Sequence, residues 1–231
     1  AEVGPTEINT EKALHLVKVH KSKLSFQYTG KGNHINDVGA VQANRPFSMN
    51  ELIGYFEVKI VNGGLRGNIA VGLSNQDFNL LHHPGKDPSS YGYQGDDGKK
   101  FEEGQGEAYG PKFGTDDVIG CGLHFGTREI FFTKNGQHLG VAFRNISHSY
   151  YPCVGLHSEG ESATLNFGAE PFVFPIATMI REEEGKFSAS ISRIHVEGSS
   201  LHELVSQYLQ HHGHFGTLAR LGPTRPAHAH A

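Results

Sequence analysis

Residues 54–60 read Gly-Tyr-Phe-Glu-Val-Lys-Ile, and this stretch decides the fold class. Its apolar residues Phe56, Val58 and Ile60 alternate with charged ones. Successive side chains of a β-strand point to opposite faces of the sheet. The alternation therefore predicts a strand with one buried face.

Similar short runs lie on both sides of this strand, at 14–16, 24–28, 69–73, 119–125 and 164–167. Two further runs flank Asn135-Gly136, a pair that supplies the two positive φ angles of a type I′ hairpin turn. No amphipathic helix of about 10–15 residues interrupts the chain between residues 14 and 175. This pattern predicts an all-β fold, an antiparallel β-sandwich.

The composition sets further limits. The chain has 231 residues, 30 glycines, 10 prolines and no tryptophan, which suits one β domain of roughly 200 residues with many turns. Its formal net charge of −4 argues against a dedicated nucleic-acid binder. No apolar run approaches the roughly 18 residues that span a bilayer, so we expect no membrane segment.

Motifs for catalysis are missing from the sequence. The chain has neither a Gly-x-Ser-x-Gly elbow nor a Walker loop, so we predict no enzymatic activity and no cofactor or metal site. Cys121 and Cys153 are too few for a disulfide scaffold. We expect both as buried free thiols, with one bridge between them as the alternative.

The composition changes after Pro175, and residues 177–199 are assigned to a linker. A helical spacing of apolar residues then follows at Leu201, Leu204, Val205, Tyr208 and Leu209. Ser200 and Glu203 fit a capping box, so a short helical segment is predicted over 200–221. Residues 1–13 are expected as an N-terminal extension and residues 222–231 as a disordered tail.

Several strings, in this order, resemble SPRY domains of the Ran-binding protein M type. They are Gly54–Ile60, Ile69–Ser74, Ser90–Gly98, Gly114–Cys121, Phe132–Gly136 and the closing residues 166–174. The resemblance covers about residues 14–176. Residues 200–221 are similar to a degenerate LisH motif, and the segments that follow LisH in that family are absent. This shortened arrangement resembles the secreted SPRY effectors of plant-parasitic cyst nematodes.

The resemblance implies a bent, concanavalin-like β-sandwich of the SPRY/B30.2 type without catalytic activity, whose loops at one edge bind peptide segments of partner proteins. Carried over by position, the candidate contact residues are Lys31, Asn33, His34, Asn36, Asp37, Arg66, Asn68, Tyr91, Tyr93, Gln94, Asp96 and Asp97. Each has a structural alternative. The two tyrosines fit core positions, Asp96 and Asp97 fit turn formers, and the polar residues of 33–37 fit side chains that hold their own loop.

One position departs from the family. Pro84-Gly85 is followed by Lys86, where the family carries a tryptophan. Tryptophan is a leading interface residue, so we expect a changed or diverged partner.

The predicted function is a non-enzymatic protein-binding module. We expect a secreted parasite effector that acts in the cytoplasm or nucleus of host plant cells and is exposed to immune receptors. One alternative is a cytosolic adaptor of a ubiquitin ligase complex, as in Ran-binding protein M, and another is a β-sandwich lectin. We expect a protein partner, no nucleic acid and no membrane. The apolar face of 201–209 is a second candidate interface, which either dimerises or docks on the sandwich; we expect docking, and hence a monomer.

Overall fold

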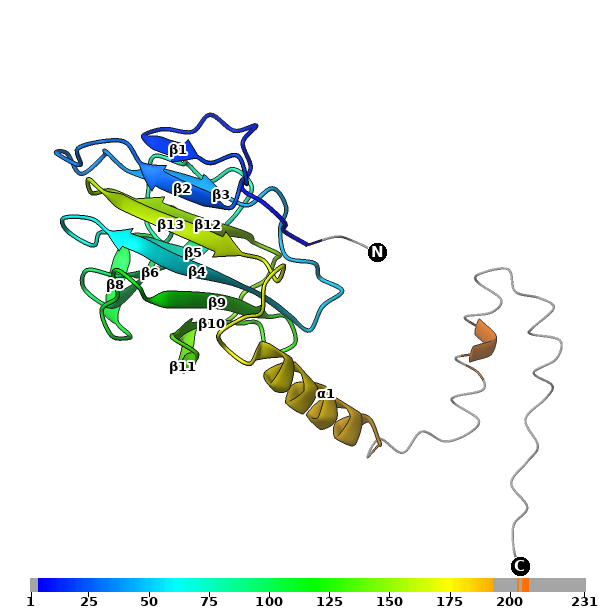
Figure 1. Ribbon diagram of the computed structural model, residues 1–231. Helices are drawn as coiled ribbons and strands as arrows, with labels where there is room; N and C mark the ends of the chain where they lie inside the picture. The colour runs from blue at the N-terminus through cyan, green and yellow to red at the C-terminus, as the bar shows by residue number, and fades with distance from the viewer. Residues whose placement is uncertain (1–3, 193–202, 204, 208–231) are drawn as a thin grey trace, which may run out of the picture. The chain divides into compact units, whose positions relative to one another are not determined.

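The computed structural model describes residues 4–192, 203 and 205–207 (Figure 1). The chain divides into two compact units, residues 1–180 and residues 181–231. Within the described residues, all thirteen strands belong to the first unit. No helix in this part of the chain is both long and apolar enough to cross a membrane.

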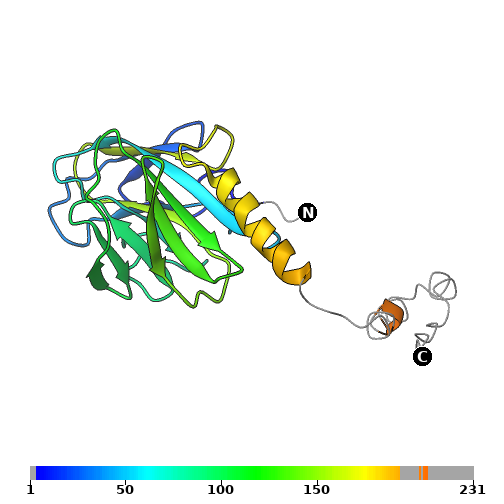
Figure 2. The same cartoon turned by 90° about the horizontal axis from the view of Figure 1, so that it is seen from below.

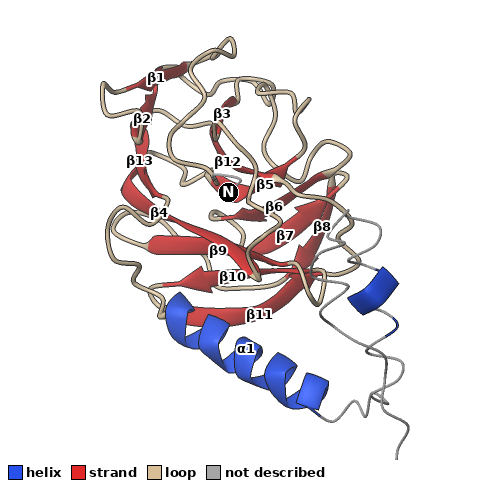
Figure 3. Cartoon of the chain, turned by 90° about the vertical axis from the view of Figure 1, so that its right-hand side faces the viewer, coloured by secondary structure: helices blue, strands red, loops and turns tan. Residues whose placement is uncertain are grey.

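The strands form two antiparallel sheets, which lie as facing layers (Figures 2 and 3). The seven-stranded sheet has the order β1-β2-β13-β4-β9-β10-β11, and the six-stranded sheet has the order β3-β12-β5-β6-β7-β8. The strand bounds are β1 Val17–Val19, β2 Ser25–Tyr28, β3 Gly39–Gln42, β4 Ile53–Gly63, β5 Ala70–Ser74, β6 Ser90–Gln94, β7 Lys99–Glu102, β8 Gln105–Ala108, β9 Val118–His124, β10 Glu129–Lys134, β11 Gln137–Phe143, β12 Tyr151–Leu156 and β13 Glu161–Asn166.

The main core fills the space between the two sheets. Phe56, Val58 and Ile60 of β4 are each 0% exposed there, together with Val71 and Leu73 of the opposite sheet. The predicted alternation of β4 therefore positions its apolar residues as expected. The predicted all-β antiparallel sandwich is confirmed.

The hairpin between β10 and β11 also matches the sequence. Asn135 and Gly136 have φ angles of 50° and 78°, as a type I′ turn requires. The turn brings Lys134 opposite Gln137, and the side-chain oxygen of Asn135 accepts a bond from the backbone N–H of Val118 at 2.8 Å. The Asn135 side chain therefore also ties this turn to the start of β9.

The second face of β4 differs from the prediction, because its first half is buried as well. Glu57 is 3% exposed, and its carboxylate accepts a hydrogen bond from the Tyr55 hydroxyl at 3.0 Å. It also accepts the backbone N–H groups of Val173 and Phe174, both at 2.9 Å. These bonds fasten the segment after β13 over β4, so a charged residue in the alternating pattern is internal here.

A helix, α1 (Ile176–Ser192), occupies most of the segment that the sequence assigns to a linker. Pro175 precedes it, and proline has a φ angle suited to a helix start. Ile176, Met179 and Ile180 recur at helical spacing and pack on a small apolar cluster with Phe174. This contact gives the first turn of α1 a tertiary partner, which the charged composition of the segment does not reveal.

The predicted LisH-like helix lies mostly outside the described residues. Leu201, Leu204, Tyr208 and Leu209 are outside them, as is the tail 222–231. Residue 203 and residues 205–207, which include Val205, have helical backbone.

Candidate functional site

Loops gather at one end of the sandwich, and hydrogen bonds join three of them. The backbone N–H of Leu65 donates to the carbonyl of Glu159 at 3.2 Å, and that of Arg66 donates to the Ser158 hydroxyl at 3.0 Å. The Arg66 guanidinium donates to the carbonyl of Gly32 at 3.2 Å. Loops 29–38, 64–69 and 157–160 thus hold one another in place, which lowers the entropy cost of binding a ligand.

Gly32 makes this close approach possible. Its φ angle is +64°, and a Cβ atom at this position would lie 2.0 Å from the backbone carbonyl oxygen of His157. Any other residue would push the two loops apart. Gly32 therefore has a packing role that the sequence alone does not show.

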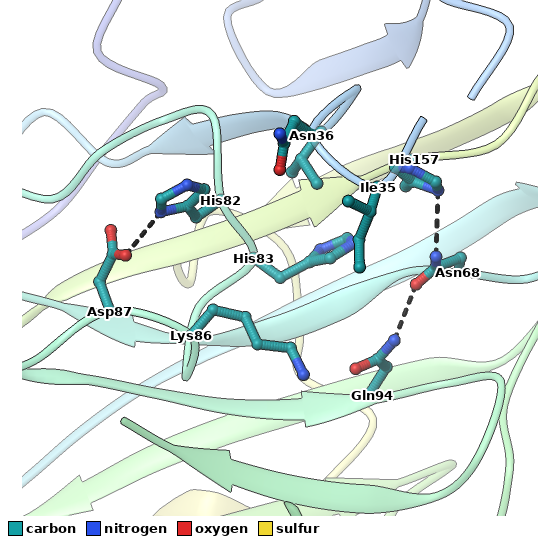
Figure 4. Close-up of a pocket in the computed structure, with 10 residues that line it drawn as sticks. Ile35, Asn36, Asn68, His82, His83, Lys86, Asp87, Gln94 and His157 are labelled. Carbon is teal, nitrogen blue, oxygen red and sulfur yellow. Dashed lines mark hydrogen bonds and ion pairs between the residues drawn. The ribbon is translucent and has the colours of Figure 1, made fainter. Parts of the chain in front are cut away.

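A cavity of about 370 Å³ opens among these loops (Figure 4). It is lined by Ile35, Asn36, Val38, Asn68, His82, His83, Lys86, Asp87, Gln94 and His157. The fourth contributing loop is 75–89, between β5 and β6. We call these four loops, together with Gln94, the edge surface.

The cavity brings together three of the predicted contact residues. Asn36, Asn68 and Gln94 all line it. Asn68 is bonded to Gln94 and to His157, and Figure 4 shows these two contacts as dashed lines. Three of the predicted contact residues therefore line one cavity, and their role as partner contacts stays a prediction.

His83 is the most unusual group in the wall. It is 6% exposed, and neither ring nitrogen has a hydrogen-bond partner among the described residues. Burial lowers the pKa of His83 to about 3, so the ring is neutral at physiological pH. The ring lies 6.2 Å from that of His157, centroid to centroid. Because buried polar groups are normally paired, the free nitrogens of His83 are candidates for ligand contacts.

Lys86 supplies a positive charge at the cavity. Its Nζ lies 3.4 Å from the centroid of the Phe101 ring, and burial lowers its pKa below the usual value. No carboxylate of the described residues forms an ion pair with it. Nearby, His82 Nδ1 and Asp87 Oδ1 lie 2.5 Å apart and satisfy each other. Lys86 stands where the family carries a tryptophan, and it places a cation over the Phe101 ring.

Glu161 ties the loops together from inside. It is 0% exposed, and its Oε2 accepts the backbone N–H groups of His157 at 2.6 Å and Ser158 at 2.9 Å. Its Oε1 has no partner among the described residues. Burial raises the pKa of Glu161 from 4.5 to about 7.

Strand β6 carries three of the predicted contact residues, and its alternation separates them. Tyr93 is 0% exposed, and its hydroxyl donates to the carbonyl of Pro111. Tyr91 is half-buried against the core, with its ring 5.4 Å from that of Tyr150. Gln94 lines the cavity instead. The prediction of Tyr93 as a surface contact is therefore wrong, and the alternative of core tyrosines describes both residues.

The other predicted residues lie outside the cavity lining. Lys31, Asn33 and His34 are exposed on loop 29–38, and Asp37 accepts the backbone N–H of His34 at 3.0 Å. Asp97 accepts the backbone N–H of Lys99 at 2.9 Å and so acts as a turn former, while Asp96 is half-buried with its pKa raised by burial. As partner contacts, these residues and Arg66 remain predictions.

Several cavity residues were not among the candidates. Ile35, Val38, His82, His83, Lys86, Asp87 and His157 line the cavity without having been chosen. A usable signal existed for Ile35, an apolar residue in a polar loop, which is 87% exposed. Leu65 is similar at 80% exposed, so two apolar side chains stand free at the edge surface. In the described segments, no group of three or more His, Cys, Asp or Glu residues is arranged to hold a metal ion.

Comparison with known folds identifies close structural relatives. A family model described as the SPRY domain matches residues 53–170. The crystal structure of a human SPRY domain has a TM-score of 0.61 and 36% sequence identity, covering 69% of this chain and 100% of that one. The SPRY domain of human HERC1 has a TM-score of 0.58 at 21% identity over 71% of this chain and 99% of that chain, which shows likeness of fold alone.

Similar curated proteins are Ran-binding proteins. Ran-binding protein 9 of Xenopus laevis is 44% identical over 198 residues, which is 84% of this chain and 36% of the relative. The Ran-binding protein M homolog of Arabidopsis thaliana is 38% identical over 216 residues, which is 93% of this chain and 46% of the relative. The chain thus spans less than half the length of these two relatives.

Proposed function

Because the chain belongs to the SPRY domain family, we propose that it is a non-enzymatic interaction module that binds an extended segment of a partner protein at the edge surface. The predicted likeness to SPRY domains and to Ran-binding proteins is confirmed. The likeness to nematode effectors and to the LisH motif stays a prediction.

The cavity is the observation that carries this proposal. Its walls come from four loops, three of them joined by hydrogen bonds, and it contains buried polar atoms without partners on His83 and Gln94. Ile35 and Leu65 stand exposed at the same edge surface. Apolar anchors around a rigid cavity with a few free polar groups are typical of a recognition site for a protein segment.

The charge of the cavity suggests what the partner offers. Lys86 has no ion pair among the described side chains, whereas Asp87 is already bonded to His82. A partner segment with an apolar side chain for Ile35 and an acidic or neutral group near Lys86 would therefore fit best.

Capture from a plant-root lysate tests the site. The native chain is compared with the double variant Ile35→Asp, Lys86→Glu, and with Met49→Asp as a matched control. Met49 is 62% exposed and precedes β4, whereas loop 64–69 follows β4, so it lies at the other end of that strand. Proteins held by the native chain and by Met49→Asp, but lost by at least about tenfold with the double variant, would support the proposal. Equal capture by all three chains would move binding away from the edge surface.

A more specific form of the proposal is a secreted parasite effector that works in the cytoplasm or nucleus of host plant cells and meets immune receptors. It rests on the resemblance of the motifs to nematode SPRY effectors. Immunolocalisation in infected roots tests it, with label expected inside plant cells beside the feeding parasite. Label confined to the parasite's own cells would contradict it.

The second candidate is an intracellular adaptor of a ubiquitin ligase complex. The 44% identity to Ran-binding protein 9 favours it. Co-purification of ligase subunits with the chain from its own cells would support the adaptor, and their absence together with label in host cells would favour the effector.

The proposed module is a monomer. Analytical ultracentrifugation of the full chain is expected to give the mass of one copy, 25.2 kDa. A dimer that the double variant Leu204→Asp, Tyr208→Asp dissociates would instead identify 201–209 as a dimer interface.

A further inference from the structure

The backbone carbonyl of His34 determines which groups donate and which accept along the hydrogen bonds of the cavity wall. His157 Nε2 lies 2.7 Å from the carbonyl oxygen of His34. A carbonyl oxygen only accepts, so Nε2 carries the proton. In the neutral ring, Nδ1 is then an acceptor, and it receives the Nδ2 amide hydrogen of Asn68 at 3.1 Å.

The hydrogen bonds continue to Gln94 with the same assignment of donors and acceptors. Since Asn68 gives its amide nitrogen to His157, its Oδ1 faces the other way and accepts from Gln94 Nε2 at 2.8 Å. Gln94 Oε1 is left without a partner among the described residues, although the residue is only 9% exposed. These hydrogen bonds therefore end in a free, buried acceptor on a residue that lines the cavity, and a ligand that satisfies it must offer an N–H or O–H donor.

Protonation of His157 would reverse the donor-to-acceptor direction of these hydrogen bonds. A charged imidazole donates from both nitrogens, so Nδ1 could no longer accept from Asn68. Rotation of the Asn68 amide by about 180° restores the bond, because its Oδ1 then faces Nδ1. Asn68 now offers its nitrogen to Gln94, and a matching rotation of the Gln94 amide turns its own nitrogen toward the cavity.

We propose that His157, Asn68 and Gln94 form a polarity relay, in which the charge of His157 decides whether Gln94 presents an acceptor or a donor to the bound partner segment. The inference rests on the proposed function, since it assigns the chemistry that the edge surface recognises. With His157 neutral, the cavity selects a ligand donor such as a side-chain amide or hydroxyl; with His157 charged, it selects a carbonyl or carboxylate. By linkage, a ligand acceptor at Gln94 also favours proton uptake by His157.

Other titratable groups surround the relay. Glu161 on β13 accepts the backbone N–H of His157, and the His83 ring lies 6.2 Å away on loop 75–89. Asp37 is bonded to the backbone of His34, and the Arg66 guanidinium to that of Gly32. Lys86, His82 and Asp87 line the same cavity. None of these side chains replaces Asn68 as the partner of His157 Nδ1.

Nuclear magnetic resonance of the free full chain tests the relay without any ligand. The chain is labelled with ¹⁵N in histidine, asparagine and glutamine and titrated from roughly pH 8 to pH 5, where an imidazole changes charge. We expect the Nε2–H form of His157 at high pH, and side-chain amide signals of Asn68 and Gln94 that shift with the same midpoint as His157. An Nδ1–H form, a Gln94 signal that does not follow, or a ring that stays neutral throughout would overturn the relay.

Variants separate the relay from general pH effects. In Asn68→Leu the Gln94 signal is expected to lose its dependence on His157. In the similarly sized Asn68→Asp it should lose it too, since a carboxylate accepts from Gln94 whether or not His157 Nδ1 carries a proton. Asn36→Leu changes the cavity wall outside the relay. Glu161→Gln removes the titration of the carboxyl group that accepts the backbone N–H of His157. Both variants should keep the coupling. Persistence of the coupling in both folded Asn68 variants would contradict the proposal.

The experiments can contradict the relay and the proposed function independently of each other. Loss of coupling in the free chain would remove the relay while leaving partner capture at the edge surface intact. Equal capture by the edge-surface variants would remove the binding site while leaving the coupled amide signals unchanged.

Discussion

Glu161 shows how one residue links the edge surface to the stability of the fold. Its carboxyl group is fully buried, and its pKa is raised from 4.5 to about 7. The unfolded chain would lose this proton near pH 4.5, so between about pH 4.5 and 7 the folded chain binds more protons. The contribution of Glu161 to stability is therefore highest below pH 4.5 and falls as the pH rises through this window.

Glu161→Gln should remove this dependence. A shift from 4.5 to about 7 corresponds to about 3 kcal/mol. We expect the free energy of unfolding of the variant, relative to the native chain, to increase by about that amount from pH 4.5 to pH 8. Urea unfolding at several pH values measures it. Glu159→Gln is the control, because Glu159 is exposed, and a native curve that parallels that of Glu161→Gln would refute the assignment.

At the scale of elements, the segment between β13 and α1 is held to β4 from outside the main core. Phe174 is 8% exposed and packs near Tyr55 and Phe131, with ring centroids 5.8 Å and 6.4 Å away. Its backbone N–H donates to Glu57. The segment therefore forms a second small core on the far face of the seven-stranded sheet, where the sequence alone suggested solvent.

Two neighbouring substitutions test that second core. Phe174→Ala removes a buried ring and is expected to lower the free energy of unfolding by about 3 kcal/mol. Val173→Ala, at a side chain that is 53% exposed, should change it by less than about 0.5 kcal/mol. Both are measured by urea unfolding followed by circular dichroism. A loss below about 0.5 kcal/mol in both variants would mean that this segment contributes little to the fold.

At the scale of the whole molecule, the reactivity of the two cysteines shows whether the sandwich unfolds as one cooperative body. Cys121 on β9 and Cys153 on β12 are free and buried in different sheets. Burial raises the pKa of Cys153 to about 12 and that of Cys121 well above its usual value. Low thiolate content and burial both suppress reactivity.

We therefore expect neither thiol to react with an aromatic disulfide reagent in the folded chain. Both should react after unfolding in urea, with release of two chromophores per chain, and Cys153→Ser should release one. Rapid reaction of one thiol under native conditions would show local opening of its sheet.

The site was predictable only in part. Candidate residues of loops 29–38 and 64–69 were expected at one edge, and these loops do meet there, together with loop 157–160. Tyr93 was misplaced because a tyrosine in an alternating strand fits either face until the partner sheet is known. His83 and Lys86 could not be placed in the cavity wall from the sequence, because a loop has no periodic pattern of apolar and polar residues.

The sequence by itself determined the two-layer all-β architecture and the Asn135-Gly136 turn, because alternation and turn chemistry act between neighbours in the chain. Tertiary structure alone decided that Glu57 is buried, that residues 176–180 have a packing partner, and that hydrogen bonds join His157, Asn68 and Gln94. Asn68 lies 26 residues from Gln94 and 89 residues from His157. Contacts over such separations depend on strand order and loop path, which only the folded sandwich specifies.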